Sequence, residues 1–330
     1  MPIKTLLFFL ALLSSHFATA QVYSVTDPLA HTFSIVARDL KTGDMAVAVQ
    51  SHWFSVGTSV SWGEAGVGVV ATQSFTNKSF GPRGLALLKS GKTAQKALDE
   101  LLAADESRDV RQVAILDAKG NVATHTGKKC IDEAGHVQGT QFSVQANMML
   151  NNTVPAAMAK AYEQHATLPL AERVLAALDA AQAAGGDIRG RQSAALLVVR
   201  GTATEGPWAD RLIDLRVDDA AEPLQELRRL LNLHRAYEHM NAGDLAVEKN
   251  DVPGAIREYE AAEKMFPQNL EMKYWHAISL ANKQQVPAAL ALLRPIFQQE
   301  PNWRILTGRL PKVGLLTVSP AELAQIMSLK

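Results

Sequence analysis

Thr32 is the residue of this 330-residue chain whose type and position most directly suggest chemistry. It opens the run from Thr32 to Asp39, whose Phe, Ile and Val side chains predict a β-strand. A threonine hydroxyl is a weak nucleophile, but a threonine at a chain end has its own α-amine, which titrates near neutrality, as a base. An N-terminal Thr32 could therefore attack an amide carbonyl, whereas an internal Thr32 would be an ordinary β-branched strand residue.

Side-chain amides occur near the ends of two other predicted strands. Gln73 and Asn77 lie at and just beyond the end of a strand, where their N–H groups could form an oxyanion hole. The alternative is a strand-end Gln and a turn-capping Asn. Gln145 and Asn147 are two residues apart on a predicted strand and so share one face, which is unusual among apolar neighbours. We expect this second pair to line a pocket.

Two arginines, Arg189 and Arg191, precede a further predicted strand. A guanidinium can hold a substrate carboxylate through two parallel hydrogen bonds, so both are candidates for substrate binding. The alternative is that they pair with Asp214 or Asp218. Because Asp214, Arg216 and Asp218 alternate along one predicted strand, we favour a ladder of internal ion pairs there.

The first twenty residues have the pattern of a secretory signal peptide. Lys4 supplies the positive charge, Thr5 to Leu13 the apolar stretch, and Ala18 to Ala20 a small-residue cleavage site. No other stretch approaches the length that spans a bilayer. We therefore predict an exported protein, periplasmic or secreted, without a transmembrane anchor. Cleavage after Ala20 would leave residues 21–31 in front of Thr32 as a propeptide.

Composition excludes several other classes of protein. Lysine plus arginine and aspartate plus glutamate both number 33, and this zero net charge argues against nucleic-acid binding. Cys130 is the only cysteine, so no intramolecular disulfide can form. The nine histidines are scattered, and His125 and His136 are assigned to loops or strand edges. Neither a metal nor another cofactor is expected.

The elements that must position these residues fall into two regions. Strands mixed with helices run from Thr32 to about Val217, and helix predominates from about Glu222 onward. Strands followed by helices and strands again indicate sheets faced by helix layers and not an alternating parallel sheet. The predicted strands are Thr32–Asp39, Met45–Ser51, Gly57–Trp62, Gly66–Gln73, Val110–Asp117, Val122–Thr126, Gln141–Gln145, Ser193–Arg200 and Arg211–Val217, and the predicted helices are Arg83–Lys89, Thr93–Ala104, Pro155–His165 and Leu170–Ala184.

The helical region contains an internal repeat of 34 residues. Ala236 to Asn269 and Leu270 to Trp303 carry small, apolar and proline residues at the offsets of the tetratricopeptide pattern. His239 and Lys273 occupy the position where that pattern has an aromatic residue. Two repeats are fewer than a solenoid usually needs for stability, so we expect them to pack against the first region or against a helix from Pro223 to Leu233. Their groove could receive a protein partner as a peptide or helix.

Several motifs of the first region share one resemblance: Thr32 to Asp39, Gly68 to Ser74 with Asn77, Gly81 to Gly84, Phe142 to Asn147, Gly190 to Ala195 and Asp214 to Asp219. Together they resemble a single bacterial family, the domain of unknown function 1028. The family is placed in the N-terminal-nucleophile (Ntn) hydrolase superfamily. The resemblance therefore implies an α+β fold, a four-layer αββα sandwich over residues 32–230. With the internal repeat, we expect a tetratricopeptide-like helical domain over residues 231–330 to follow it.

The resemblance also implies roles for individual residues. Thr32 would be the nucleophile once it is the mature N-terminus, exposed either by autoproteolysis after His31 or by an exported protease. Ser51 and His52 lie where superfamily members keep a polar residue near the nucleophile, although an exposed loop explains them as well. We therefore expect an exported amidohydrolase that cleaves a small amide or peptide-like substrate. The alternative is a non-catalytic binding or scaffold protein. Sandwiches of this kind often pair through a helical face, which predicts a homodimer.

Overall fold

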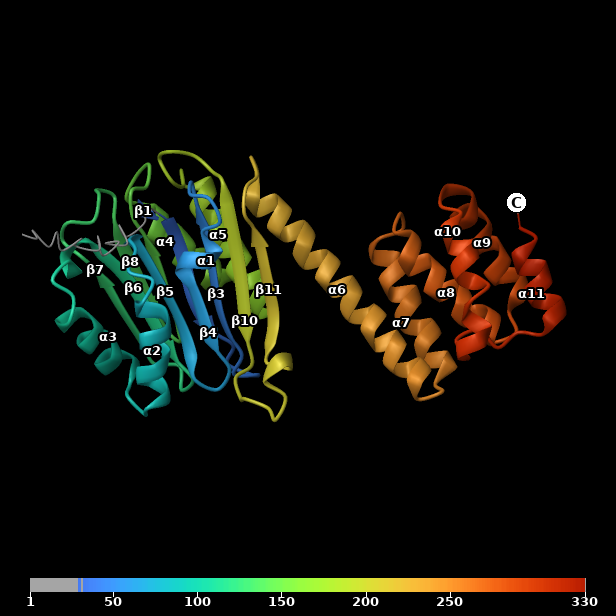
Figure 1. Cartoon of the computed structure of the whole chain (residues 1–330). Helices are drawn as coiled ribbons and strands as arrows, with labels where there is room; N and C mark the ends of the chain where they lie inside the picture. Colours follow the sequence, from blue (N-terminus) through green and yellow to red (C-terminus); the bar gives the residue numbers. More distant parts are fainter. Residues whose placement is uncertain (1–28, 31, 330) are drawn as a thin grey trace, which may run out of the picture.

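The strands of the first region form two antiparallel sheets, and a helical region follows them (Figure 1). This computed structural model describes residues 29–30 and 32–329. The predicted signal peptide and residues 21–28 and 31 of the predicted propeptide lie outside these described residues. The predicted mixture of sheets and helices with a C-terminal helical region is confirmed. No helix in the described ranges is both long and apolar enough to cross a membrane.

The first sheet is built around β5, which pairs with β6 on one side and with both β1 and β4 on the other. The two short strands lie end to end, because β4 pairs with Gly68 to Ala71 and β1 pairs with Ser74 and Phe75. The members of this sheet are β1 (Leu29–Ala30), β4 (Ser61–Glu64), β5 (Gly68–Phe75), β6 (Arg111–Asp117) and β7 (Val122–Thr126).

The second sheet has the order β11-β10-β3-β2-β9-β8, so the strand that begins at Thr32 is central. Thr32 pairs with Ser51, and Ser51 pairs in turn with Ser193. These three residues therefore lie side by side across the sheet. Its strands are β2 (Thr32–Arg38), β3 (Met45–Ser51), β8 (Gly135–Gly139), β9 (Phe142–Ala146), β10 (Ser193–Val199) and β11 (Arg211–Val217).

The two sheets pack face to face, and helices cover the outer face of each. Alternation along each strand decides which side chains meet: Val36 and Val47 pack against Leu116 between the sheets, while Ile35 packs under the helices of the second sheet. The first sheet is covered by α2 (Phe80–Lys89) and α3 (Ala94–Ala103), and the second by α4 (Val154–Gln164) and α5 (Leu170–Ala183).

The helical region begins with α6, which runs from the β11 edge of the second sheet (Figure 1). Its first half packs on the second sheet through Leu224 and Leu227, and its second half packs on the next helices through Met240. The helices are α6 (Pro223–Glu248), α7 (Val252–Met265), α8 (Leu270–Asn282), α9 (Val286–Gln299), α10 (Asn302–Thr307) and α11 (Pro320–Met327).

Several elements differ from their prediction or were not predicted. The predicted strand Gly57–Trp62 is wrong, because Gly57–Val60 forms the short helix α1 and only the last two residues belong to β4. Close packing explains the helix, since a methyl group on Gly57 would lie 2.5 Å from Cβ of Ala195. The edge strand β8 was not predicted. The helix predicted to end at Leu233 continues to Glu248.

Candidate active site

One end of the space between the sheets is lined by polar side chains. Gln73 and Gln112 of the first sheet face Ser34 and Gln145 of the second sheet, and Asn147 follows β9 at the same end. All five side chains are completely buried. We call these five residues the amide cluster. Gln145 lies on β9 and Asn147 just beyond its end, and both side chains belong to this cluster.

Hydrogen bonds connect the amide cluster across the two sheets. Ser34 Oγ donates to Gln73 Oε1 at 2.6 Å and accepts from Gln145 Nε2 at 2.6 Å. Gln112 Oε1 accepts from Gln73 Nε2 at 2.7 Å and from Asn147 Nδ2 at 2.9 Å. Because buried amides without partners cost free energy, this satisfied network fixes the position of each side chain.

Thr32 lies directly beside the amide cluster and is itself completely buried. Its carbonyl oxygen accepts from the Asn147 backbone N–H at 3.1 Å, from Gln73 Nε2 at 3.2 Å and from Asn147 Nδ2 at 3.4 Å. The two residues of β1 that precede it pair with β5 in the first sheet, whereas Thr32 starts β2 in the second. The chain thus passes from one sheet to the other immediately before Thr32.

Strained backbone conformations flank the amide cluster on both sheets. Ser74, which follows Gln73, has a φ of +72°, and Met148, which follows Asn147, has a φ of +58°. Residues with a side chain rarely adopt this left-handed conformation, and it persists only where the surrounding structure enforces it. Such strain concentrates at functional sites, so its position supports the choice of this end of the sandwich.

Ser51 and His52 lie at the same end of the second sheet as Thr32. Ser51 is buried and is the cross-strand neighbour of Thr32. The His52 ring is exposed, with Nδ1 3.3 Å from the carbonyl oxygen of Arg191, and its backbone N–H donates to Asp187 at 3.1 Å. Ser51 therefore belongs to the candidate site, and His52 lies at its outer margin.

The two arginine candidates form ion pairs that were not predicted. Arg189 Nη2 lies 2.7 Å from Asp187, whose carboxylate is completely buried, and Arg191 pairs with Glu222. Neither arginine is paired with Asp214 or Asp218. Asp187 lies two residues before Arg189, in the turn before β10, whereas Glu222 precedes α6 and is 31 residues from Arg191.

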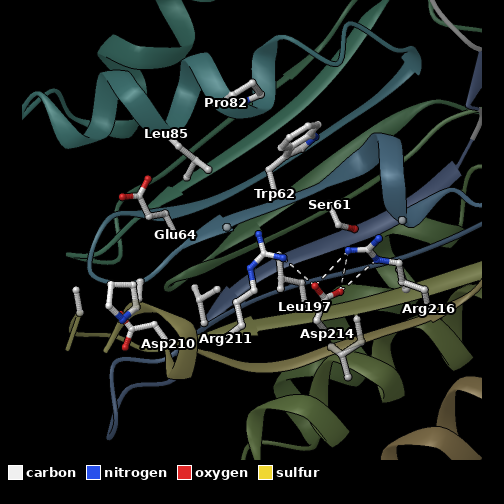
Figure 2. A pocket seen from close by; sticks show the side chains of 18 of the residues that line it. Ser61, Trp62, Glu64, Pro82, Leu85, Leu197, Asp210, Arg211, Asp214 and Arg216 are labelled. Carbon is white, nitrogen blue, oxygen red and sulfur yellow. Dashed lines mark hydrogen bonds and ion pairs between the residues drawn. The ribbon is translucent and has the colours of Figure 1, made fainter. Parts of the chain in front are cut away.

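The predicted ladder of ion pairs on β11 is correct only in part. Asp214 pairs with Arg216 at 3.1 Å and also with Arg211 at 2.8 Å (Figure 2). Asp218 lies beyond the end of β11 and accepts a hydrogen bond from Ser55 Oγ at 2.6 Å. The ladder is therefore a cluster of two guanidinium groups on one carboxylate.

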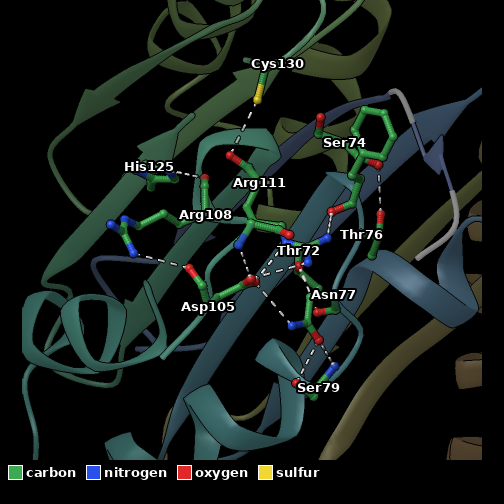
Figure 3. A network of polar contacts seen from close by, with 12 residues as sticks. Thr72, Ser74, Thr76, Asn77, Ser79, Asp105, Arg108, Arg111, His125 and Cys130 are labelled. Carbon is green, nitrogen blue, oxygen red and sulfur yellow. Dashed lines mark hydrogen bonds and ion pairs between the residues drawn. The ribbon is translucent and has the colours of Figure 1, made fainter. Parts of the chain in front are cut away.

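Asn77 is directed away from Thr32, which is a correction to its predicted place in the oxyanion hole. Its Oδ1 accepts from the backbone N–H of Ser79 at 3.1 Å, and its Nδ2 donates to Asp105 at 3.4 Å (Figure 3). These contacts place it at the start of α2, on the outer side of the first sheet. Asn77 therefore stabilises the turn after β5, and Gln73 remains the amide on this strand that reaches Thr32.

Asp105 and Arg111 form a largely buried ion pair behind Asn77, at 2.8 Å (Figure 3). Burial alone raises the pKa of Asp105, but hydrogen bonds from Arg111 and from the backbone N–H of Ser107 hold the pKa below its ordinary value. A lowered folded-state pKa means that the pair stabilises the fold above the unfolded-state pKa of about 4, and that this stabilisation is lost as the pH falls through the folded-state pKa.

Replacing Asp105 by asparagine is therefore expected to lower the free energy of unfolding by about 2 kcal/mol at pH 7. The difference in the free energy of unfolding between the variant and the unchanged protein should become smaller in acid, because Asp105 is then protonated in both the folded and the unfolded state. Urea unfolding at several pH values measures it. The exposed Asp99→Asn change on α3 is the matched control, and an equal effect of the two substitutions would contradict the assignment.

Sequence reasoning missed Gln112, which joins more groups than any other member of the amide cluster. Besides accepting two hydrogen bonds, its Nε2 lies 2.9 Å from the oxygens of both Ala146 and Thr126. A single amide near the start of an apolar strand gives no local signal. Only the packing of β6 across from β9 shows its role.

No group of three or more His, Cys, Asp or Glu side chains in the described ranges is arranged to hold a metal ion. Cys130 is buried, and its thiol donates to the carbonyl oxygen of Arg111 at 3.4 Å. Burial raises the pKa of the Cys130 thiol, which disfavours the reactive thiolate. The side chains of the amide cluster carry hydroxyl and amide groups.

Comparison with known proteins identifies the family. Residues 32–227, more than half of the chain, match the model described as "Family of unknown function (DUF1028)", so the chain belongs to the DUF1028 family. It is similar to a crystal structure of a DUF1028 protein from Silicibacter pomeroyi, with 31% sequence identity and a TM-score of 0.55. That match covers 61% of this chain and 85% of the other. No curated protein matches the chain.

Proposed function

We propose that this protein is an exported amidohydrolase of the Ntn type, in which Thr32 becomes the mature N-terminus and attacks a small amide or peptide-like substrate. The observation that carries the proposal is the position of Thr32, at the start of a central strand and within hydrogen-bonding distance of two buried side-chain amides. The arrangement of two packed sheets between helix layers is compatible with the four-layer Ntn sandwich.

The proposed reaction uses Thr32 as both nucleophile and base. Its α-amine takes the proton of the hydroxyl while Oγ bonds to the substrate carbonyl carbon, and the same proton then passes to the leaving nitrogen as the C–N bond breaks. Water hydrolyses the resulting ester and restores the hydroxyl. The amides of Gln73 and Asn147, together with the backbone N–H of Asn147, donate to the Thr32 carbonyl oxygen, and we assign them to positioning the nucleophile.

Processing must precede this activity. In the chain described here Thr32 is completely buried, and β1 is paired to β5 beside it. Removal of the residues before Thr32 would create the α-amine and also remove β1 from its place beside β5. We infer that the longer chain is an inactive precursor, with cleavage between His31 and Thr32 either by the Thr32 hydroxyl itself or by an exported protease.

The mature N-terminus tests the proposal. The exported protein is purified, and its intact mass and N-terminal sequence are determined. We expect a species that begins at Thr32. Recovery of protein that begins only at Gln21 would contradict the proposal, because the α-amine of Thr32 would then not exist.

The second candidate function is a scaffold, and the helical region favours it. That region lies away from the sandwich at the far end of α6, so its surface is accessible (Figure 1). We propose that its repeat is tetratricopeptide-like and binds a peptide or helix of a partner. Removing residues 249–330 keeps α6 whole and should abolish co-purification of that partner. Retention of the partner would contradict this function. The predicted homodimer is a separate proposal, and sedimentation analysis of the purified protein would test it.

A further inference from the structure

A cleft of about 730 Å³ lies at the side of the sandwich, where β4 of the first sheet faces β10 and β11 of the second (Figure 2). Its floor is apolar and is made by Ala195 and Leu197 of β10, which are almost fully buried. Thr32 and the amide cluster do not line it. This cleft is therefore a separate site that does not depend on processing of the N-terminus.

Two arginines on β11 place positive charge at one side of the cleft. Arg211 donates from Nη1 to Asp214 at 2.8 Å, and Arg216 donates to the same carboxylate from Nε and Nη2, both at 3.2 Å. Two guanidinium groups thus share one carboxylate, which leaves one net positive charge. Each guanidinium has five N–H donors, so both retain donors for a ligand that enters the cleft.

The other charged residues of the cleft do not cancel this charge locally. Glu64 and Lys89 pair with each other at 2.5 Å. Asp210 directly precedes Arg211, but its carboxylate has its own partners, since Thr204 donates to it at 2.7 Å and Arg200 lies 3.9 Å away. The cluster of Arg211, Asp214 and Arg216 is therefore the part of the cleft with uncompensated charge.

Trp62 supplies a flat apolar wall next to these arginines (Figure 2). Its indole N–H donates to the carbonyl oxygen of Ser59 at 3.1 Å, which fixes the orientation of the ring. The ring also packs closely on α2, since a methyl group on Gly81 would lie 2.2 Å from it. A rigid aromatic wall beside a cationic group suits a ligand that is flat and apolar at one end and anionic at the other.

We propose that this cleft binds a small organic carboxylate with a flat apolar body. The carboxylate accepts from the N–H groups of Arg211 and Arg216 that are not bound to Asp214, and the body lies against Trp62 and above Leu197. Charge-assisted hydrogen bonds to the guanidinium groups determine the selectivity for an anion.

The test compares phenylacetate with phenylacetamide, which has the same body without the charge. The two probes are added to the full chain while the indole N–H signals are followed by ¹H–¹⁵N NMR, and the Trp62→Phe variant identifies the signal of Trp62. We expect phenylacetate to shift that signal with a Kd on the order of 1 mM, and phenylacetamide to bind about tenfold more weakly or not at all. Absence of the shift, or equal binding of both probes, overturns the proposal.

Charge variants then test the role of the arginines. Arg211→Gln and Arg216→Gln each leave Asp214 with one partner and should weaken phenylacetate binding about tenfold. Asp214→Asn removes the competing carboxylate and should strengthen it. The control is Arg228→Gln, which breaks an exposed ion pair with Asp179 on another face and should change nothing. Weaker binding by Asp214→Asn, or an equal loss in the control, also overturns the proposal.

Discussion

Replacing Thr32 by alanine is expected to abolish amide turnover by the processed protein, with a loss on the order of 10³-fold or more. The variant retains the α-amine but lacks the hydroxyl that attacks the carbonyl. Both proteins are produced as Met followed by residues 32–330, so that removal of the methionine exposes residue 32 without any further processing. Release of amines from a panel of small N-acyl amides measures the rate.

Two further variants separate catalysis from folding. Thr32→Ser keeps a hydroxyl at the same position and should retain much of the activity. Thr72→Ala removes another buried hydroxyl, which donates to the carbonyl oxygen of Asn77 on the outer side of the first sheet, and should leave turnover unchanged. If Thr32→Ala turned over the amides as fast as the unchanged protein, Thr32 would be only a strand residue.

Replacing Gln112 by leucine is expected to lower the free energy of unfolding by about 4 kcal/mol. The substitution keeps the approximate size of the side chain but removes one acceptor from the buried amide of Gln73 and one from that of Asn147. It also removes the donor from Ala146 and Thr126, and each unsatisfied buried group is costly. Urea unfolding followed by circular dichroism measures the change.

Gln95→Leu is the matched control, because Gln95 is an exposed residue of α3 that donates to Asp99. We expect its effect to stay within about 0.5 kcal/mol. If both substitutions cost the same free energy, the amide cluster would not hold the two sheets together in the way described above.

Local sequence patterns correctly predicted those elements in which the residue types and the flanking turn residues favour the structure that forms. The hairpin of β2 and β3 is an example, because runs rich in Val, Ile, Phe and Ala flank the polar turn at Lys41 to Asp44. The helix at Gly57 could not be predicted in this way. Thr58 and Val60 are β-branched and favour a strand, but contact with β10 enforces a helical turn. β8 was missed because it begins and ends with glycine and lies at an exposed edge.

The candidate site was predictable to the extent that its residues share one strand. Gln145 and Asn147 are two positions apart, so the pattern itself indicated a common face. Gln112 and Ser34 give no such signal, since Gln112 follows Arg111 at the start of its strand and Ser34 lies between two apolar residues. Both side chains form hydrogen bonds with Gln73. These contacts depend on how strands that are distant in sequence pack together. Asn77 was misplaced because it lies on the turn, beyond the strand whose alternation would have set its direction.

The single helix α6 has a consequence for how the molecule unfolds. At 1.5 Å per residue its 26 residues span about 39 Å, and the two halves are buried in different cores. Melting one half removes the helical hydrogen bonds that stabilise the start of the other. The sandwich and the helical region therefore share cooperativity, and a molecule bound to the last helices would raise the melting temperature of the sheets.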